Sequence, residues 1–282
     1  MLTQIGDVEI WRVLEQNAPF LTPEELWPEA GEDVARIVEE KVSGALDAAS
    51  GRLILPVQGF LLKTPAHVIL VDSCVGNHKT NNFPDWHMRD ESRFEAGLVA
   101  AGVGFDEVDY VLCTHLHPDH VGWNTKLENG TWVPTFPNAK YLLPAADEEM
   151  LRTADVPFYN ESVLPVIEAG QAELVQPGHM LGDLVRLVPT PGHSPGHVAI
   201  EITSQGRTAL ITGDALHCTA QCWHPEWHFV YDADGARAAV SRRALLAHAA
   251  EARSLVLGSH FKLPSIGHVR TDGDAFAWED LE

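Results

Sequence analysis

Apolar and polar positions alternate along parts of this chain in a way that predicts a β-rich fold. Strict alternation predicts a strand over residues 8–13. Further runs of strand length are rich in valine, isoleucine and leucine, and those over 53–62 and 67–71 predict a hairpin. The other predicted strands cover residues 108–114, 140–143, 173–175, 184–188, 208–212 and 254–257, and we expect the last of these to be the final strand.

Between these strands, apolar residues recur at helical spacing. The pattern predicts helices over residues 32–46 and 91–101, and a long one over residues 233–253. Residues 17–27 contain Pro19 and Pro23 and predict an irregular arm. Strands followed by helices occur in both halves, with no linker or repeat, so we expect one α/β domain over residues 1–282.

The densest chemistry lies in His115-Leu116-His117-Pro118-Asp119-His120, directly after the predicted strand over 108–114. Alternate side chains of an extended chain share one side, so His115 and His117 should point together. Pro118 favours this, because proline pushes the preceding residue into extended geometry and also suits the first turn of a helix. Asp119 and His120 then project differently, so the spacing predicts two adjacent metal positions. The alternative is a surface turn that is rich in histidine by coincidence, which this density of ligand types disfavours.

The pattern H-x-H-x-D-H resembles the signature of the metallo-β-lactamase superfamily. The resemblance implies a four-layer αββα sandwich, with two mixed β-sheets face to face and helices outside. It also implies later ligands that each follow a predicted strand: His193, Asp214 and His260. It covers the chain from about Leu53 to His260 and does not explain residues 1–50, the N-terminal strand and arm.

The ligand set implied by the resemblance divides between two ions. The first ion takes His115, His117 and His193, the second takes Asp119, His120 and His260, and Asp214 bridges both. The resemblance also implies that Asp72, at the end of the strand over 67–71, lies behind the site and orients a histidine ligand. His197 falls at a structural position of the family and is left out of the metal set.

These nitrogen and oxygen donors suit two divalent ions, zinc first, with manganese, cobalt or iron also able to enter. Two such ions about 3.5–4 Å apart hold a hydroxide between them and lower its pKa. We therefore expect that hydroxide to attack a neutral ester or lactone carbonyl, with Asp119, Asp214 and His217 as catalytic groups and Asp214 relaying a proton. The alternative from a different class is a non-catalytic metal-binding module.

Within the superfamily, residues 120–123 and 260–264 resemble the branch of acyl-homoserine lactonases and methyl-parathion-type hydrolases. Those lactonases commonly carry a tyrosine three residues after the bridging aspartate, where this chain has His217. We expect His217 either to contact the substrate or to hydrogen-bond behind the site. The alternative reactions are organophosphate triester hydrolysis, a β-lactamase-like activity and a mono-iron persulfide dioxygenase.

Aromatic residues gather in two segments, residues 20–27 and 223–231. Each predicts either a wall of the substrate pocket or a homodimer contact, since aromatic residues are enriched in both. A role in the core is the third interpretation. The expected pocket residues are Phe20, Trp123, Trp223 and Phe229.

The charge of the chain disfavours two classes of binding partner. Forty acidic residues against 19 basic ones give a formal net charge of −21, which repels nucleic acids and anionic membrane surfaces. No apolar run is long enough to span a bilayer and no signal peptide is recognised, and the four cysteines are scattered. We expect a cytoplasmic enzyme with a small-molecule substrate.

Overall fold

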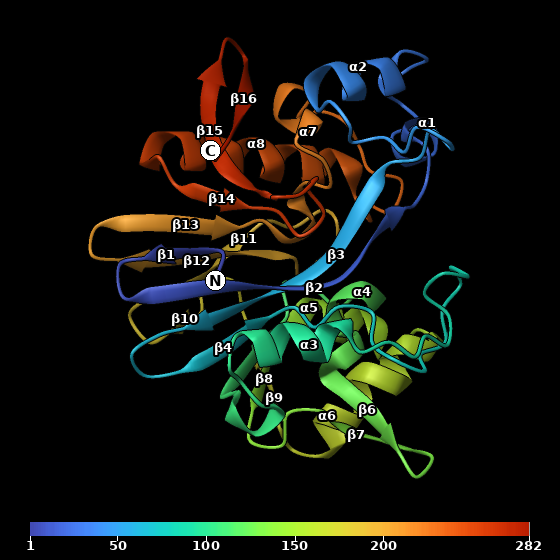
Figure 1. Cartoon of the computed structure of the whole chain (residues 1–282), viewed down its shortest axis with the longest axis vertical. Coiled ribbons are helices and arrows are strands. Elements are labelled where there is room, and N and C mark those ends of the chain that lie inside the picture. The colour runs from blue at the N-terminus through green and yellow to red at the C-terminus, as the bar shows by residue number, and fades with distance from the viewer. Residues whose placement is uncertain (282) are drawn as a thin grey trace. The chain divides into compact units, whose positions relative to one another are not determined.

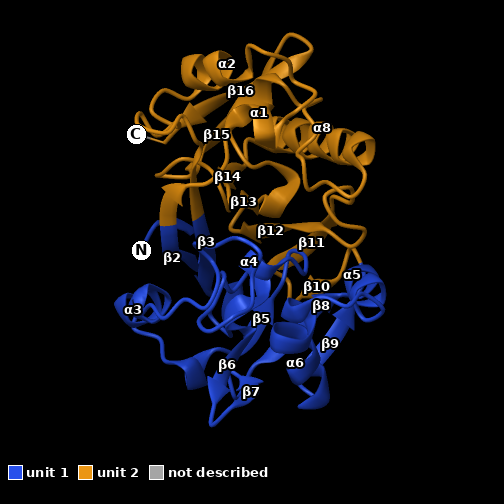
Figure 2. Ribbon diagram, turned by 90° about the vertical axis from the view of Figure 1, so that its right-hand side faces the viewer, with its two compact units in different colours: residues 1–16, 57–176 blue, residues 17–56, 177–282 orange. Residues whose placement is uncertain are grey.

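The computed structural model describes residues 1–281. The chain divides into two compact units, coloured separately in Figure 2. Unit 1 comprises Met1–Gln16 and Val57–Gln176, and unit 2 comprises Asn17–Pro56 and Pro177–Glu282. Each unit contains one large mixed sheet, so the two sheets expected from the resemblance are confirmed. A single domain over residues 1–282 stays a prediction.

The sheet of unit 1 has seven strands in the order β1-β2-β3-β4-β5-β8-β9. Their bounds are β1 (Thr3–Ile5), β2 (Val8–Pro19), β3 (Ile54–Lys63), β4 (Val68–Val71), β5 (Tyr110–Leu112), β8 (Lys140–Pro144) and β9 (Ala172–Val175). The predicted hairpin is confirmed, because β3 and β4 pair antiparallel. From β4 to β9 the strands run parallel. The carboxyl ends of β4 and β5 therefore meet at one edge, where α/β folds gather binding residues.

Helices and a small hairpin complete unit 1. They are α3 (Arg93–Ala100), η1 (Phe105–Glu107), α4 (Pro118–Val121), η2 (Gly122–Asn124), β6 (Thr125–Glu128), β7 (Thr131–Pro134), α5 (Ala145–Leu151), η3 (Tyr159–Val163) and α6 (Leu164–Glu168). The turn between β6 and β7 uses Asn129 and Gly130, with φ angles of 52° and 81°. Positive φ at both positions is typical of a tight hairpin turn, and Asn-Gly is the sequence that adopts it most readily.

The sheet of unit 2 also has seven strands, in the order β10-β11-β12-β13-β14-β15-β16. Their bounds are β10 (Met180–Leu181), β11 (Val185–Pro189), β12 (Val198–Ser204), β13 (Arg207–Ile211), β14 (Leu255–Leu257), β15 (Ile266–Asp272) and β16 (Ala275–Asp280). Strands β11 and β13 are both antiparallel to β12, and β13 is parallel to β14. The carboxyl ends of β11, β13 and β14 therefore point the same way.

The helices of unit 2 are α1 (Pro23–Leu26), α2 (Val34–Lys41), η4 (Gly213–Ala215), α7 (Ala220–Trp223) and α8 (Gly235–Ala252). Helix α8 packs along β15 (Figure 1). Its buried Leu245 and Ala249 belong to one apolar cluster with Leu210 of β13 and Val256 of β14. This packing fixes the long helix to the strands that lead into the candidate site.

Two expectations need correction. Residues 17–27 are not an irregular arm, because β2 continues to Pro19 and α1 spans Pro23–Leu26. Thr22 and Glu25 form a capping box, in which the Thr22 N–H donates to Glu25 Oε2 at 2.8 Å. Pro23 lies in the first turn, where its missing N–H costs no hydrogen bond, so the proline begins this helix.

The second correction concerns the end of the sheet. The strand over residues 254–257 is not the last, because β15 and β16 follow it as an antiparallel hairpin. The last three residues of β15 and the last two of β16 are exposed and polar, and Arg270 is paired with Glu279. Strand β16 is the edge of the sheet, and β15 lies between it and β14. Because part of each strand faces solvent, their sequences lack the apolar run that marks β14.

Candidate metal-binding residues

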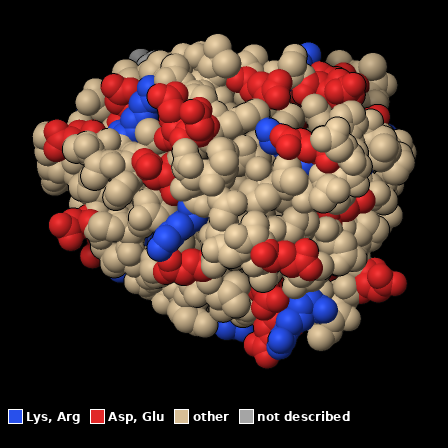
Figure 3. Space-filling model, turned by 90° about the horizontal axis from the view of Figure 1, so that it is seen from below, with Lys and Arg blue, Asp and Glu red and all other residues tan. Residues whose placement is uncertain are grey.

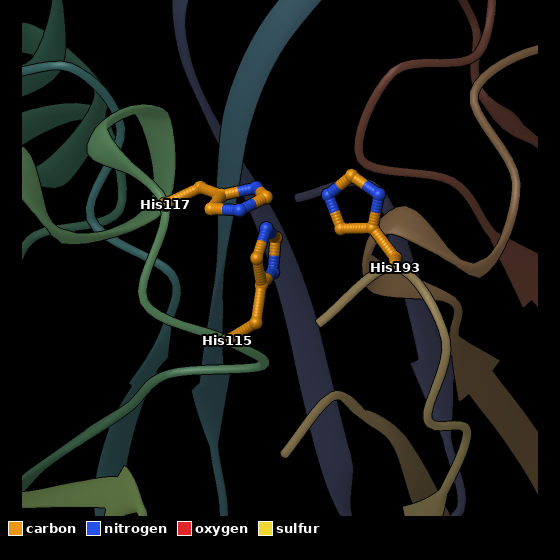
Figure 4. Close-up of side chains that lie close together, drawn as sticks. All are labelled: His115, His117 and His193. Carbon is orange, nitrogen blue, oxygen red and sulfur yellow. The ribbon is translucent and has the colours of Figure 1, made fainter. Parts of the chain in front are cut away.

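The central motif of unit 1 lies on the loop after β5 and on the first turn of α4. His117 is extended, with φ −74° and ψ 157°, and α4 begins at Pro118. The rings of His115 and His117 lie 4.6 Å apart between centroids, at an interplanar angle of 78°. These two side chains therefore point together as predicted (Figure 4). Asp119 and His120 lie on the first turn of α4, and the ring of His120 lies 4.1 Å from that of His115.

Asp72 lies directly after β4 and reaches the motif with both carboxylate oxygens. Oδ1 accepts the Thr114 N–H at 2.8 Å, and Oδ2 accepts the Thr114 hydroxyl at 2.9 Å. The Nδ1 atom of His120 lies 2.9 Å from Oδ2. Asp72 is buried, and its φ is 58°, a left-handed conformation that aspartate tolerates better than most residues. Because Nδ1 of His120 is engaged, Nε2 is the nitrogen that a metal ion would use.

A second buried carboxylate supports the motif, although the sequence did not predict it. Asp147, on the first turn of α5, accepts the Leu116 N–H at 3.2 Å through Oδ2. The neighbouring His115 has Nδ1 3.1 Å from the Thr114 hydroxyl. The backbone of the motif is thus held from α5 as well as from Asp72 after β4. An aspartate in the first turn of a helix is common without any such role, so Asp147 had no distinctive signal in the sequence.

In unit 2, three expected ligands follow three strands whose carboxyl ends point the same way. His193 follows β11, Asp214 follows β13 and His260 follows β14. Asp214 Oδ2 lies 3.3 Å from Nε2 of His193, and Asp214 Oδ1 lies 3.2 Å from Nε2 of His260. All three side chains are buried. One carboxylate therefore presents its two oxygens to two different histidines.

The other ring nitrogen of each unit 2 histidine has its own oxygen partner. Nδ1 of His193 lies 3.0 Å from Asp232 Oδ1, and Nδ1 of His260 lies 2.7 Å from the carbonyl oxygen of Pro56. Burial alone would lower the pKa of His193, but its hydrogen bonds with Asp214 and Asp232 raise that pKa to about 9. Asp232 was not anticipated, because it lies 39 residues from His193 and outside any motif.

His197 uses both ring nitrogens within the protein. Nδ1 lies 2.8 Å from the Thr190 hydroxyl, and Nε2 accepts the Asp214 N–H at 2.9 Å. A ring with both nitrogens bonded in this way has no lone pair for a metal ion. This geometry fits the structural position that the resemblance gives it.

His217 contacts Asp214 directly. Its Nε2 lies 3.0 Å from Asp214 Oδ2, and its ring stacks on Phe229 with centroids 3.4 Å apart at 11°. Burial lowers the pKa of His217 to about 4, so the imidazole is neutral near pH 7. A neutral ring beside a carboxylate donates through the nitrogen that faces it, which here is Nε2.

The four expected pocket residues have different surroundings. Trp123 is buried, stacks on Phe94 at 4.9 Å, and donates its Nε1–H to Glu15 at 2.7 Å. Phe229 is buried, while Phe20 and Trp223 are partly exposed. In unit 2 the two aromatic segments meet: the ring of Trp27 lies 6.4 Å from that of Phe229. Their role in a pocket stays a prediction.

The distances within each unit fit a metal ion. Two donors bound to one zinc ion at about 2.1 Å lie roughly 3.4 Å apart in tetrahedral geometry. Nε2 of His193 and Nε2 of His260 lie 3.3 and 3.2 Å from the Asp214 oxygens, and Nε2 of His120 lies 3.6 Å from Asp119 Oδ2. These donor sets, nitrogen with carboxylate oxygen, are those that zinc accepts.

The chain matches a protein-family model and is similar to known proteins. The model described as the metallo-beta-lactamase superfamily matches residues 54–260. N-acyl homoserine lactonase AiiA of Bacillus thuringiensis subsp. kurstaki is 32% identical over 180 residues, which are 59% of this chain and 67% of the relative.

Two solved structures cover almost the whole chain. The hydrolase AbOPH of the beta lactamase superfamily has a TM-score of 0.82 at 23% identity and covers 99% of this chain and 96% of its own. AidC, described as a dizinc quorum-quenching lactonase in complex with a product, has a TM-score of 0.83 at 18% identity and covers the same shares. At these identities the likeness shows the fold.

Proposed function

The chain belongs to the metallo-beta-lactamase superfamily, and we propose that it is a dinuclear metal-dependent hydrolase that opens lactone and ester bonds. Its relative AiiA is an N-acyl homoserine lactonase, and its structural neighbour AidC is a dizinc lactonase. Both names point to hydrolysis of a cyclic ester. The residues described above supply the donors that such a reaction needs.

In this proposal seven side chains hold two divalent ions. His115, His117 and His193 bind one ion, and Asp119, His120 and His260 bind the other. The observation that carries the proposal is the arrangement of Asp214, whose two oxygens face His193 and His260 separately. A carboxylate that serves one ion has no need to offer each oxygen to a different histidine, whereas a bridging one does.

When bound, a pair of divalent ions lowers the pKa of a water molecule and polarises a carbonyl oxygen. The protein's part is to keep every ligand in the correct tautomer. Asp72 holds Nδ1 of His120, Asp232 holds Nδ1 of His193, and Pro56 holds Nδ1 of His260. Each contact directs Nε2 toward the ligand position. We assign Asp214 the further role of accepting a proton during hydrolysis.

The substrate we propose is small and neutral. The sequence carries a formal net charge of −21, and Figure 3 shows acidic side chains spread over the face it draws, with basic ones in small groups beside them. Long-range repulsion then disfavours polyanions. No helix among residues 1–281 is both long and apolar enough to cross a bilayer. Aromatic side chains such as Phe229 favour an apolar acyl or aryl group.

His217 supports phosphotriester hydrolysis as a second candidate activity. Lactonases of the resembled branch commonly place a tyrosine hydroxyl where this chain has His217, and the Nε2–H of His217 is engaged by Asp214. We therefore assign His217 the role of holding Asp214. Without the tyrosine donor, discrimination in favour of a lactone carbonyl should be weaker, and neutral phosphotriesters should also react.

The test is a panel of lactones, aryl esters, phosphotriesters and β-lactams assayed with zinc-loaded enzyme. We expect lactones or aryl esters to show the highest kcat/KM, phosphotriesters a lower value and β-lactams little. His217→Tyr should shift the ratio toward lactones. A panel led by β-lactams would refute the substrate class while leaving the metal ligands in place.

Four further points belong to the same proposal. Zinc is the proposed metal, because a nitrogen-rich set with carboxylate oxygens suits it. The proposed location is the cytoplasm, and all four cysteines are buried free thiols within the described residues.

We also propose that residues 1–282 form one domain, because the family match at 54–260 includes residues of both units. A homodimer that uses residues 20–27 or 223–231 stays a prediction.

A further inference from the structure

Arg242 is a fully buried arginine on α8, and its guanidinium reaches several segments of unit 2. Nε donates to the carbonyl oxygen of Ala215 at 2.7 Å. Nη1 donates to the carbonyl oxygens of Pro225 and Trp227, at 2.8 and 2.7 Å. Burying a guanidinium is costly unless its charge is paired and its donors are used. The buried charge of Arg242 therefore needs a negative partner in addition to these three carbonyl oxygens.

The negative partner of Arg242 is Asp232. Nη2 of Arg242 lies 3.7 Å from Asp232 Oδ2, and the two side chains are 0% and 1% exposed. The same Oδ2 accepts the Phe229 N–H at 2.9 Å, while Oδ1 contacts Nδ1 of His193 at 3.0 Å. The next residue, Ala233, donates its N–H to the carbonyl oxygen of His193 at 3.1 Å. Asp232 is therefore fixed on one side by α8 and on the other by a proposed metal ligand.

Each member of the Arg242–Asp232 pair contacts a proposed metal ligand or the residue next to one. Through Asp232, Arg242 is connected to His193 on the loop after β11. Through the carbonyl of Ala215, it fixes the backbone directly after Asp214, on the turn that follows β13. We propose that Arg242 and Asp232 form a positioning pair that holds His193 and Asp214 in the geometry for a metal ion. This inference rests on the proposed metal ligands and adds to them two residues outside the family's ligand motifs.

The physical role of each member follows from its contacts. Asp232 accepts the Nδ1–H of His193, so that Nε2 carries the lone pair for the ion and becomes a better donor. The Phe229 N–H holds Asp232 Oδ2 by a hydrogen bond, and Arg242 places its positive charge 3.7 Å from the same oxygen. Three carbonyl oxygens keep the guanidinium in that position. Partners of this kind typically contribute 10–100-fold to metal affinity.

The test compares Asp232→Asn, Arg242→Gln, the double variant, and Arg243→Gln as a matched control. Arg243 is the next residue of α8, is 46% exposed, and pairs with the exposed Glu226 at 3.4 Å. Zinc affinity is measured by chelator competition, and the cobalt-loaded proteins are compared by their visible absorption spectra. Urea unfolding of the metal-free proteins measures any purely structural effect.

We expect each single variant to lose about 10–100-fold in affinity for the more affected ion and to change the cobalt spectrum. The double variant should lose about as much as the worse single variant, because the two residues act as one unit. Arg243→Gln should match the parent. If Arg242→Gln does not fold, Arg242→Lys, which keeps the charge but not the fork of donors, replaces it.

Parent-like zinc affinity and cobalt spectra in Asp232→Asn would overturn the inference. So would losses that multiply in the double variant, or reduced stability of the metal-free proteins with unchanged zinc affinity. None of these measurements uses turnover. A failure of the proposed function, seen as a zinc-loaded parent that hydrolyses nothing in the panel, is therefore distinguishable from a failure of this inference.

Discussion

Two substitutions of Asp72 should distinguish its contribution to the stability of the fold from its contribution to metal binding. Its carboxylate accepts two hydrogen bonds from Thr114 and one from His120, at 2.8, 2.9 and 2.9 Å. Bonds to a buried charged acceptor contribute about 1.5–3 kcal/mol each, and they are not additive. Asp72→Ala removes all three and leaves the Thr114 N–H buried without its acceptor. We expect the free energy of unfolding of the metal-free protein to fall by about 3–5 kcal/mol.

Asp72→Asn should lower stability less than Asp72→Ala does, but should lower metal affinity at least as much. The amide oxygen still accepts the Thr114 N–H, so the loss of stability should be smaller than for alanine. The amide NH₂ then faces Nδ1 of His120, which must offer a lone pair, and the ring proton moves to Nε2. A protonated Nε2 cannot bind a metal ion. Affinity for the ion held by His120 should therefore fall at least as far as in Asp72→Ala, by about 10–100-fold or more.

The assay is zinc affinity by chelator competition beside urea unfolding of the metal-free proteins. Asp109→Asn is the matched control, because Asp109 also accepts a backbone N–H, from Val68 at 2.8 Å, but is 49% exposed. We expect the control to keep full zinc affinity. If Asp72→Asn binds two ions as tightly as the parent, the reasoning on the tautomer of His120 is refuted.

Three further outcomes are expected. Elemental analysis of fully loaded protein should give about two divalent ions per chain, and a single iron would instead favour the dioxygenase alternative. Asp119→Ala should keep the fold, lose one ion and hydrolyse esters at least about 100-fold more slowly, as metal analysis and turnover would show; near-normal turnover would contradict the proposed ligand set. Burial lowers the pKa of Lys79 from 10.5 to about 6, so the unfolded chain binds more protons than the folded one between these values. Lys79 should therefore add up to about 1.4 kcal/mol of stability per pH unit in that window, which opposes the loss expected below pH 9 from His193, whose pKa is raised. Between pH 7 and 9 the slope of stability against pH in urea unfolding should be lower in Lys79→Met than in the parent by up to about 1.4 kcal/mol per unit.

The sequence predicted the elements whose pattern is local and strong. The apolar run before His115 gave β5, and proline after His117 placed the start of α4 correctly. The hairpin of β15 and β16 was missed because exposed polar residues at the end of each strand interrupt the apolar pattern. The helix at Pro23 was missed because a proline in a first turn and a proline in an irregular segment look alike until the cap is seen.

The site shows the same division between local and distant information. A motif of six residues indicates its own ligands, because their spacing is a local property. The partners that orient those ligands are brought close only by the fold: Asp232 lies 39 residues from His193, and the Pro56 carbonyl lies 204 residues from His260. A backbone carbonyl has no sequence signature at all, and a single aspartate is too common to be one. Such contacts can be found only from coordinates.

The orienting partners also differ in kind, which has a consequence for the two proposed ions. His120 and His193 each face a buried carboxylate, whereas His260 faces a neutral carbonyl and His115 a hydroxyl. A carboxylate makes the opposite ring nitrogen more basic than a neutral acceptor does. In the proposed ligand set each ion has one histidine of the carboxylate type. With the proposed ligands, a carboxylate strengthens one histidine at each metal position: Asp72 acts on His120, and Asp232 acts on His193.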